Sequence, residues 1–276
     1  MMRLAAVMLF TATATAALAA DLQPVKDAGP YVPSPQSVVS DMLRYADVGA
    51  NDFLIDLGSG DGRIVLTAAK VFGARGFGVE IKEDLVRKAN EAAQKEGVGD
   101  RVKFMKADLF KTDISQATVI TMYLLPDTVN LLKEKFLTEL RPGTRIVSHD
   151  YPLTGWIPEK YVQMDLEDKV QISGVTTTLI YLYIVPAKVA GKWEAHMPPV
   201  ISKQPATLSL KQQLTRVSGS VRLDGHDVPL EDVKLRGDHL SFKLAGRKGA
   251  FSGVVKGNAI EGMVDGKTPW SASLGG

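Results

Sequence analysis

Cysteine is absent from this 276-residue chain. Without cysteine there is no disulfide, no thiolate metal site and no cysteine nucleophile. A strong net charge is missing too, because 33 Lys and Arg residues face 31 Asp and Glu residues, for a formal net charge of +2. The overall charge therefore selects neither nucleic acid nor an anionic membrane, and we expect no nucleic-acid partner.

Long hydrophobic runs are absent after the N-terminus, which itself has the pattern of a secretory signal. Arg3 is followed by an apolar stretch over residues 4–16, and residues 17–19 form a small-x-small cleavage site just before Asp21. The stretch is short and rich in alanine for a membrane span of about 20 residues. We therefore expect residues 1–20 to be a signal peptide, the protein to be exported to the periplasm, and the mature chain to have no stable membrane span. The alternative is an uncleaved N-terminal anchor.

The phosphate-binding pattern G-x-x-x-x-G-K-[S/T] is also absent, although the chain contains a different glycine-rich loop. Residues 53–63 read FLIDLGSGDGR, an apolar run that ends in Asp56 and is followed by glycines at 58, 60 and 62. This pattern predicts a buried parallel strand, a tight loop and the start of a helix. Because glycine accepts positive φ and has no side chain, a ligand can approach such a loop closely.

The charge of this loop indicates the kind of ligand. A dinucleotide site has G-x-G-x-x-G spacing and presents a helix N-terminus to a pyrophosphate, but here Asp56 and Asp61 flank the loop and would repel phosphate. A cationic ligand without phosphate fits better, and S-adenosylmethionine (SAM) carries a sulfonium and an ammonium. We therefore assign Asp56 and Asp61 to cofactor binding, together with the loop residues Gly58, Ser59 and Gly60.

Two further acidic residues come at the ends of the next two predicted strands. Glu80 follows the apolar residues 76–79, about 20 residues beyond the loop, where an acid can bind ribose hydroxyls. Asp108 follows the strand at 102–105, where it can meet the adenine amino group. One such acid alone is often a helix cap, whereas three at consecutive strand ends indicate a shared site.

Strands alternate with helices over the first two thirds of the chain, which predicts an α/β fold with a parallel sheet. Residues 161–166 and 176–185 are expected to add an antiparallel edge. We divide the chain into a signal peptide (1–20), a catalytic domain (21–186), a proline-rich linker (187–205) and a small antiparallel β domain (206–276). In that last domain, Gly237-Asp238 and Gly257-Asn258 predict two-residue hairpin turns.

With these residues in place, residues 30–185 resemble the class I, seven-stranded SAM-dependent methyltransferases. Three sequence motifs, PYVPS (30–34), DLGSGDGRIV (56–65) and WIP (156–158), carry a closer resemblance. They are similar to motifs of the mitochondrial lysine methyltransferases that act on the c subunit of ATP synthase, and of their bacterial relatives. The resemblance implies a Rossmann-like seven-stranded methyltransferase sheet, to which the small C-terminal β domain is added. That domain has no counterpart in the mitochondrial members, and the signal-like segment replaces their membrane anchor.

The resemblance also implies residue roles. Asp56, Gly58 and Gly60 would contact the methionine part of SAM, and Tyr31 and Pro33 would close over the cofactor. Tyr123 would line the channel for the substrate amine; the alternative is a packed aromatic residue at a strand end. His149 and Asp150 follow the strand at 145–148 and can accept a proton, unless they lie in a solvated loop.

The implied function is SAM-dependent methylation of a protein lysine, so the expected partner is a protein methyl acceptor or, in the alternative, a small-molecule one. Small-molecule O- or N-methylation stays open, as does an exported binding protein that has lost turnover. The Asn/Asp-Pro-Pro-Tyr motif of DNA and glutamine methyltransferases is absent. No metal is expected, although Asp127 and Asp150 leave a metal-dependent O-methyltransferase open. Export conflicts with the cytosolic supply of SAM, so a cytoplasmic location is the alternative.

Overall fold

The structure is a computed structural model that describes residues 31–275. The predicted signal peptide, residues 1–20, lies outside the described residues. Among residues 31–275, no helix combines the length and the apolar character needed to cross a membrane.

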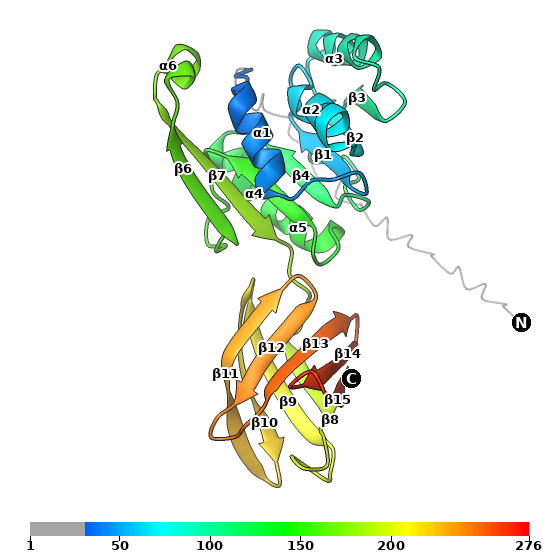
Figure 1. The fold of residues 1–276 in the computed structure, drawn as a ribbon, viewed down its shortest axis with the longest axis vertical. Coiled ribbons are helices and arrows are strands. Elements are labelled where there is room, and N and C mark those ends of the chain that lie inside the picture. Colours follow the sequence, from blue (N-terminus) through cyan, green and yellow to red (C-terminus); the bar gives the residue numbers. More distant parts are fainter. Residues whose placement is uncertain (1–30, 276) are drawn as a thin grey trace, which may run out of the picture.

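The N-terminal part of the described chain, up to residue 184, forms a seven-stranded mixed sheet in the order β3-β2-β1-β4-β5-β7-β6 (Figure 1). Its strands are β1 (Phe53–Leu57), β2 (Arg75–Glu80), β3 (Val102–Lys106), β4 (Val119–Met122), β5 (Arg145–His149), β6 (Lys160–Asp165) and β7 (Thr177–Ile184). Strands β1 to β5 pair in parallel, whereas β7 runs antiparallel to both β5 and β6. This confirms the predicted methyltransferase-type sheet with its antiparallel edge.

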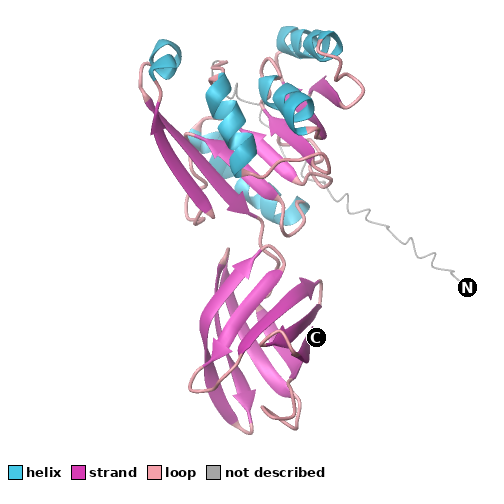
Figure 2. Ribbon diagram, viewed as in Figure 1, coloured by secondary structure: helices cyan, strands magenta, loops and turns pink. Residues whose placement is uncertain are grey.

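Helices cover both faces of this sheet (Figure 2). The helices are α1 (Gln36–Tyr45), α2 (Arg63–Phe72), α3 (Glu83–Lys95), α4 (Pro126–Leu131), α5 (Lys133–Glu139) and α6 (Glu167–Ser173). Alternate strand residues face opposite cores: Leu54 packs with α1, α2 and α3, whereas Ile55 packs with the helix residues Val129 and Phe136. A strand buried on both faces explains why 53–57 reads as a nearly continuous apolar run.

The helical segment between β4 and β5 is divided into two short helices. It consists of α4 and α5, with Leu132 between them at helical angles of φ −75° and ψ −15°. Pro126 occupies the first turn, where its missing N–H costs nothing. This short helix pair and the following turn place β5 beside β4.

The C-terminal part is a closed eight-stranded antiparallel barrel. Its strands are β8 (Gly191–His196), β9 (Ala206–Gln213), β10 (Arg216–Leu223), β11 (His226–Arg236), β12 (His239–Leu244), β13 (Ala250–Lys256), β14 (Ala259–Val264) and β15 (Thr268–Leu274). Both predicted hairpin turns are confirmed, with Gly237 and Gly257 at φ 61° and 60°.

One expectation for this region is wrong: the segment predicted as a linker, 187–205, contains strand β8. Trp193 and Ala195 point inward and are fully buried, while Lys192, Glu194 and His196 beside them are exposed. This alternation offers only two inward side chains beside a run of prolines, so it was too short to be recognised from the sequence. β8 pairs with β9 and β15 and thereby closes the barrel.

The barrel joins the sheet at the edge opposite the carboxyl ends of the parallel strands. β7 begins beside the end of β5, where Ile180 pairs with His149, and finishes where Ile184 pairs with Arg145. Next to this end the Ala187 N–H donates to the Gly237 carbonyl at 2.8 Å, and Arg236 pairs with Glu159 at 2.8 Å. The barrel therefore does not cover the carboxyl edge of the sheet.

Candidate active site

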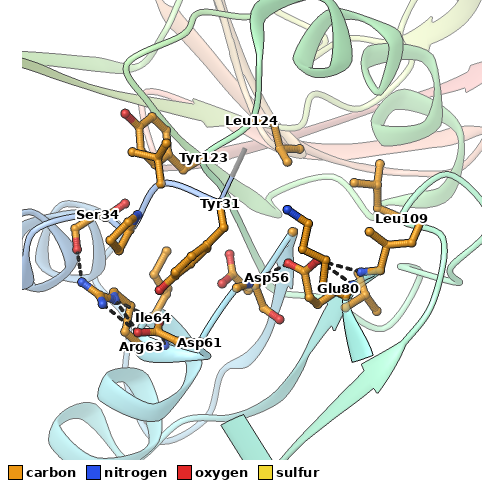
Figure 3. A pocket seen from close by; sticks show the side chains of 18 of the residues that line it. Tyr31, Ser34, Asp56, Asp61, Arg63, Ile64, Glu80, Leu109, Tyr123 and Leu124 are labelled. Carbon is orange, nitrogen blue, oxygen red and sulfur yellow. Dashed lines mark hydrogen bonds and ion pairs between the residues drawn. The ribbon is translucent and has the colours of Figure 1, made fainter. Parts of the chain in front are cut away.

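A pocket opens at the carboxyl ends of β1, β2, β3 and β4 (Figure 3). The predicted cofactor residues that line it are Tyr31, Pro33, Asp56, Gly58, Ser59, Gly60, Asp61, Glu80 and Asp108, and Tyr123 lines it as well. The structure thus brings together all of the residues that the sequence assigned to the cofactor.

The glycine loop is fixed by the neighbouring strand. The N–H groups of Gly58 and Ser59 both donate to the Val79 carbonyl at 2.9 Å. Gly60 has φ 53°, and a Cβ at this position would lie 2.4 Å from the Tyr31 ring. Glycine is therefore required at 60 both by the backbone conformation and by the close approach of Tyr31.

Asp56 ends β1 in a buried position, with 2% of its surface exposed. Its carboxylate accepts a 2.7 Å hydrogen bond from the Thr121 hydroxyl. Burial raises the pKa of Asp56 to about 7, against the lowering effect of that hydrogen bond, and the nearby carboxylates of Asp61 and Glu80 raise it further. A cation bound beside Asp56 would reverse this effect, because an opposite charge favours the ionised carboxylate.

Glu80 is held at the end of β2 by backbone groups on two sides. Its carboxylate accepts hydrogen bonds from Gly60 N–H at 3.0 Å, Ile81 N–H at 2.8 Å and Lys82 N–H at 3.0 Å. Asp108 is fixed in a similar way, by the Phe110 N–H at 2.9 Å. Both acids therefore have set orientations at the rim of the pocket.

The segment before α1 crosses the pocket and is tied down by an arginine that the sequence analysis missed. The Arg63 guanidinium binds both carboxylate oxygens of Asp61, with contacts of 2.6–3.2 Å, and donates to the Ser34 carbonyl at 2.8 Å. Figure 3 shows Tyr31 between this ion pair and Asp56. Burial and the Asp61 carboxylate raise the pKa of Tyr31 to about 12, so its phenol stays neutral.

Tyr123 belongs to a polar cluster with Asp150 and Lys169, in which Lys169 is buried and the other two residues are partly buried. The Tyr123 hydroxyl donates to Asp150 at 3.1 Å, and the Lys169 ammonium binds the two carboxylate oxygens of Asp150 at 2.6 and 2.7 Å. Burial and the Asp150 carboxylate raise the pKa of Tyr123 well above its usual value. Lys169 comes from α6 and carried no signal in the sequence, because a single lysine in a short polar helix is ordinarily exposed.

His149, the last residue of β5, is fully buried, so the solvated-loop alternative is wrong for this residue. Its Nδ1 lies 2.8 Å from the Ser34 hydroxyl, and its ring packs on Tyr123 with centroids 3.9 Å apart. Burial lowers the pKa of His149 to about 4, which keeps it neutral at physiological pH. Neither His149 nor Asp150 is among the described residues that line the pocket; they contact its wall through Ser34 and Tyr123. Their role as proton acceptors stays a prediction.

The pocket suits an adenosyl cation, because carboxylates and positive-φ glycines line it. No set of three or more His, Asp or Glu side chains among residues 31–275 is arranged to hold a metal.

Several known proteins are similar to the part of the chain that forms this site. Residues 56–160 match the family model described as the ANTKMT methyltransferase domain. A protein-lysine N-methyltransferase of Saccharolobus islandicus is 42% identical over 157 residues, which cover 56% of this chain and 93% of that protein. The adenine nucleotide translocase lysine N-methyltransferase of Mus musculus is 34% identical over 129 residues, 47% of this chain and 56% of that protein. The ATP synthase c-subunit lysine N-methyltransferase of Xenopus laevis is 32% identical over 130 residues, 47% of this chain and 57% of that protein.

A solved structure is also similar. An RNA methyltransferase from Salinibacter ruber, in complex with S-adenosyl-L-homocysteine, has 46% identity and a TM-score of 0.52, over 57% of this chain and 96% of that chain. None of these matches extends over the whole chain. Because the archaeal relative is matched over nearly its full length, and the glycine loop and its acids lie in the shared part, this chain belongs to the class I SAM-dependent methyltransferases of the ANTKMT and ATP synthase c-subunit lysine methyltransferase family.

Proposed function

We propose that this chain transfers a methyl group from SAM to a lysine side chain of a protein. The observation that carries the proposal is the similarity to the archaeal protein-lysine N-methyltransferase, which is 42% identical to this chain over 93% of the archaeal protein's length. The chain spans little more than half of the Xenopus laevis relative, so the proposal names the class of acceptor and not the particular protein in that relative's name.

The residues of the pocket divide the work of cofactor binding. When bound, SAM supplies a methyl group activated by its sulfonium. Asp56 and the loop at Gly58 and Gly60 hold the cationic methionine end, Glu80 accepts from the ribose hydroxyls, and Asp108 accepts from the adenine amino group. Tyr31 and Pro33 close the pocket over the ligand, held there by the contact of Arg63 with Ser34.

The acceptor has different requirements. A lysine amine has a reference pKa near 10.4, so it arrives as an ammonium and must lose a proton before it can attack a methyl group. Asp150 supplies negative charge to attract the ammonium, and Tyr123 stands between this carboxylate and the pocket. Desolvation at this buried place favours the neutral amine. Catalysis then depends largely on bringing the reacting atoms to about 3–3.5 Å.

Methylation of RNA is the second candidate, because the Salinibacter ruber structure is described as an RNA methyltransferase. The nearly balanced charge of this chain, 33 basic against 31 acidic residues, offers little to a polyanion. A small-molecule acceptor and a binding protein without turnover are the remaining alternatives.

Labelled SAM distinguishes these candidates. The protein is incubated with soluble and membrane fractions of its host, which are then treated with proteinase or with ribonuclease. We expect label that proteinase releases and that amino-acid analysis identifies as methyl-lysine. Label lost to ribonuclease, or found in a proteinase-resistant small molecule, would refute a protein acceptor.

Matched variants show whether the signal belongs to this site. Asp56→Asn should abolish labelling, while Asp84→Asn, on the exposed outer side of α3, should not change it. Calorimetry with SAM tests the binding protein without turnover: such a protein would bind SAM and label nothing.

A further inference from the structure

Helix α6 stands at the tip of the β6–β7 hairpin (Figure 1). β7 starts directly after α6 and runs antiparallel to β5, so α6 lies beside the carboxyl end of β5. The residue that follows this end is Asp150, whose N–H donates to the Leu179 carbonyl of β7 at 2.7 Å. The helix is therefore a neighbour of the amine side of the site and not of the barrel.

A single described side chain holds α6 in place. Lys169 has 2% of its surface exposed. The other α6 residues whose side chains the structure describes, Glu167, Val170 and Gln171, are exposed. A helix normally docks through an apolar stripe, whereas the described contacts of α6 centre on an ammonium that binds Asp150 and the Thr177 carbonyl.

Asp150, which binds the Lys169 ammonium, also contacts Tyr123 in the wall of the cofactor pocket. Asp150 accepts from Lys169 on both oxygens and from the Tyr123 hydroxyl on one of them. Asp150 has φ 63°, a left-handed conformation that costs energy for a residue other than glycine but that Asp tolerates better than most. The end of β5 is thus shaped to present this carboxylate between a lysine and a pocket-lining phenol.

We propose that Lys169 occupies the subsite of the substrate's lysine ammonium, so that α6 is an internal substrate mimic that an incoming protein lysine must displace. The inference rests on the proposed lysine methylation. Asp150 is the carboxylate proposed above to attract the substrate ammonium, and its side chain is only 12% exposed, so leaving it without a cation is unfavourable. Release of Lys169 and entry of the substrate are therefore one exchange.

This exchange makes the closed helix a competitor of the substrate. If the subsite is free for only a fraction of the time, the apparent affinity for a lysine substrate falls to that fraction of its intrinsic value. A helix closed nine tenths of the time weakens substrate binding roughly tenfold. SAM binding is not affected, because the SAM pocket lies on the other side of Tyr123.

The direct test uses binding and needs no turnover. Lys169→Ala deletes the atoms of an n-propylammonium ion, and n-propylamine is therefore the probe. We expect the probe to raise the thermal stability of Lys169→Ala and to bind it at least roughly tenfold more tightly than it binds the wild type. The double variant Lys169→Ala/Asp150→Asn should not respond, and Lys88→Ala, an exposed lysine of α3, should behave as the wild type. A folded Lys169→Ala protein that ignores the probe overturns the inference.

A second variant covers the case in which Lys169→Ala does not fold. Lys169→Met keeps the length of the side chain and removes its charge. We expect faster hydrogen exchange in α6, a KM for a lysine peptide lowered roughly tenfold, and an unchanged Kd for SAM. If Lys169 were only structural, α6 would loosen while KM stayed constant or rose, which would contradict the inference.

The two proposals fail in different ways. If the probe binds Lys169→Ala but neither the wild type nor the variants methylate any lysine, lysine methylation is wrong and the ammonium subsite stands. If the wild type methylates lysine and the probe does not bind, the mimicry is wrong and lysine methylation stands.

Discussion

Asp56 is a carboxylate that the free protein does not keep fully charged at neutral pH, since its pKa is raised to about 7 by burial. A cationic ligand lowers this pKa in the complex, so below pH 7 binding must expel a proton. We expect the affinity for SAM to fall by about tenfold per pH unit below pH 7 and to be constant above it.

Calorimetry between pH 5.5 and 8.5, in buffers of different ionisation enthalpy, measures both the affinity and the released proton. Asp56→Asn has no proton to release and should bind weakly at every pH. A wild-type affinity that does not change over this range would rule out contact between Asp56 and a cation.

Glu80 is the second residue whose role can be measured alone. Glu80→Gln keeps the shape of the side chain, removes its charge and leaves one carbonyl oxygen in place of two acceptors. The loss of ribose hydrogen bonds should weaken SAM binding by about 1–2 kcal/mol, roughly 5- to 30-fold. Glu83→Gln, at the exposed start of α3, is the control and should leave the Kd unchanged. Equal affinities for both variants would refute the role of Glu80.

At the scale of residues, the sequence predicted the acidic residues of the site but not Arg63, Lys169 and Ser34, whose hydrogen bonds and ion pairs hold the site residues in place. Asp56, Glu80 and Asp108 were found because each ends an apolar run, which is a local pattern. Lys169 and Ser34 act through contacts with residues 19 and 115 positions away, and such distances leave no trace in a local pattern. Arg63 could have been noticed in the sequence, since it follows the acidic loop directly. Its two parallel contacts with the Asp61 carboxylate, however, depend on the folded structure.

The segment that leads into α1 is the element on which closure of the pocket depends. Arg63 holds it through Ser34 and pairs with Asp61 by two parallel contacts. Lysine cannot make this fork. We expect Arg63→Lys to weaken SAM binding by about 1–2 kcal/mol with little change in secondary structure.

Calorimetry and circular dichroism together test this prediction. Arg87→Lys, in an exposed pair with Glu91 on α3, provides the matched control. If Arg63→Lys binds SAM as the wild type does, the segment closes without the arginine.

Helices and strands with a clear periodic pattern of apolar residues were predicted well, because that pattern follows directly from which side chains are buried. The strands of the first sheet that were predicted from the sequence lie within a few residues of their expected positions. The failure was β8, whose two inward residues, Trp193 and Ala195, are too few to show an alternation. The closure of the barrel depends on pairing between strands far apart in sequence, so it became visible only in three dimensions.

On the scale of the whole molecule, the barrel and the pocket lie at opposite edges of the first sheet, and each part has its own apolar core. A chain that ends after Pro186 should therefore bind SAM within about twofold of the full-length Kd. Its melting temperature should be lower than that of the full-length protein, because Leu214, between β9 and β10, packs against the apolar core that contains Ile55 and Phe136. Loss of SAM binding by a truncated protein that is still folded would show that the barrel shapes the pocket.

The predicted signal peptide is tested on the mature protein. We expect N-terminal sequencing of material from the host to give a start at Asp21 and fractionation to place it in the periplasm. A start at Met1 or Met2 would contradict cleavage.

The length of strand β7 sets a minimum length for any methyl acceptor that contacts both the amine side of the site and the barrel. Its eight residues run from the neighbourhood of Asp150 to the junction with the barrel, a span of about 25 Å. A free amino acid or a small metabolite is far too short to touch the barrel wall while its amine is at Tyr123. Only an extended or macromolecular acceptor can bridge the two, so a gain in affinity contributed by the barrel would itself be a measure of the size of the substrate.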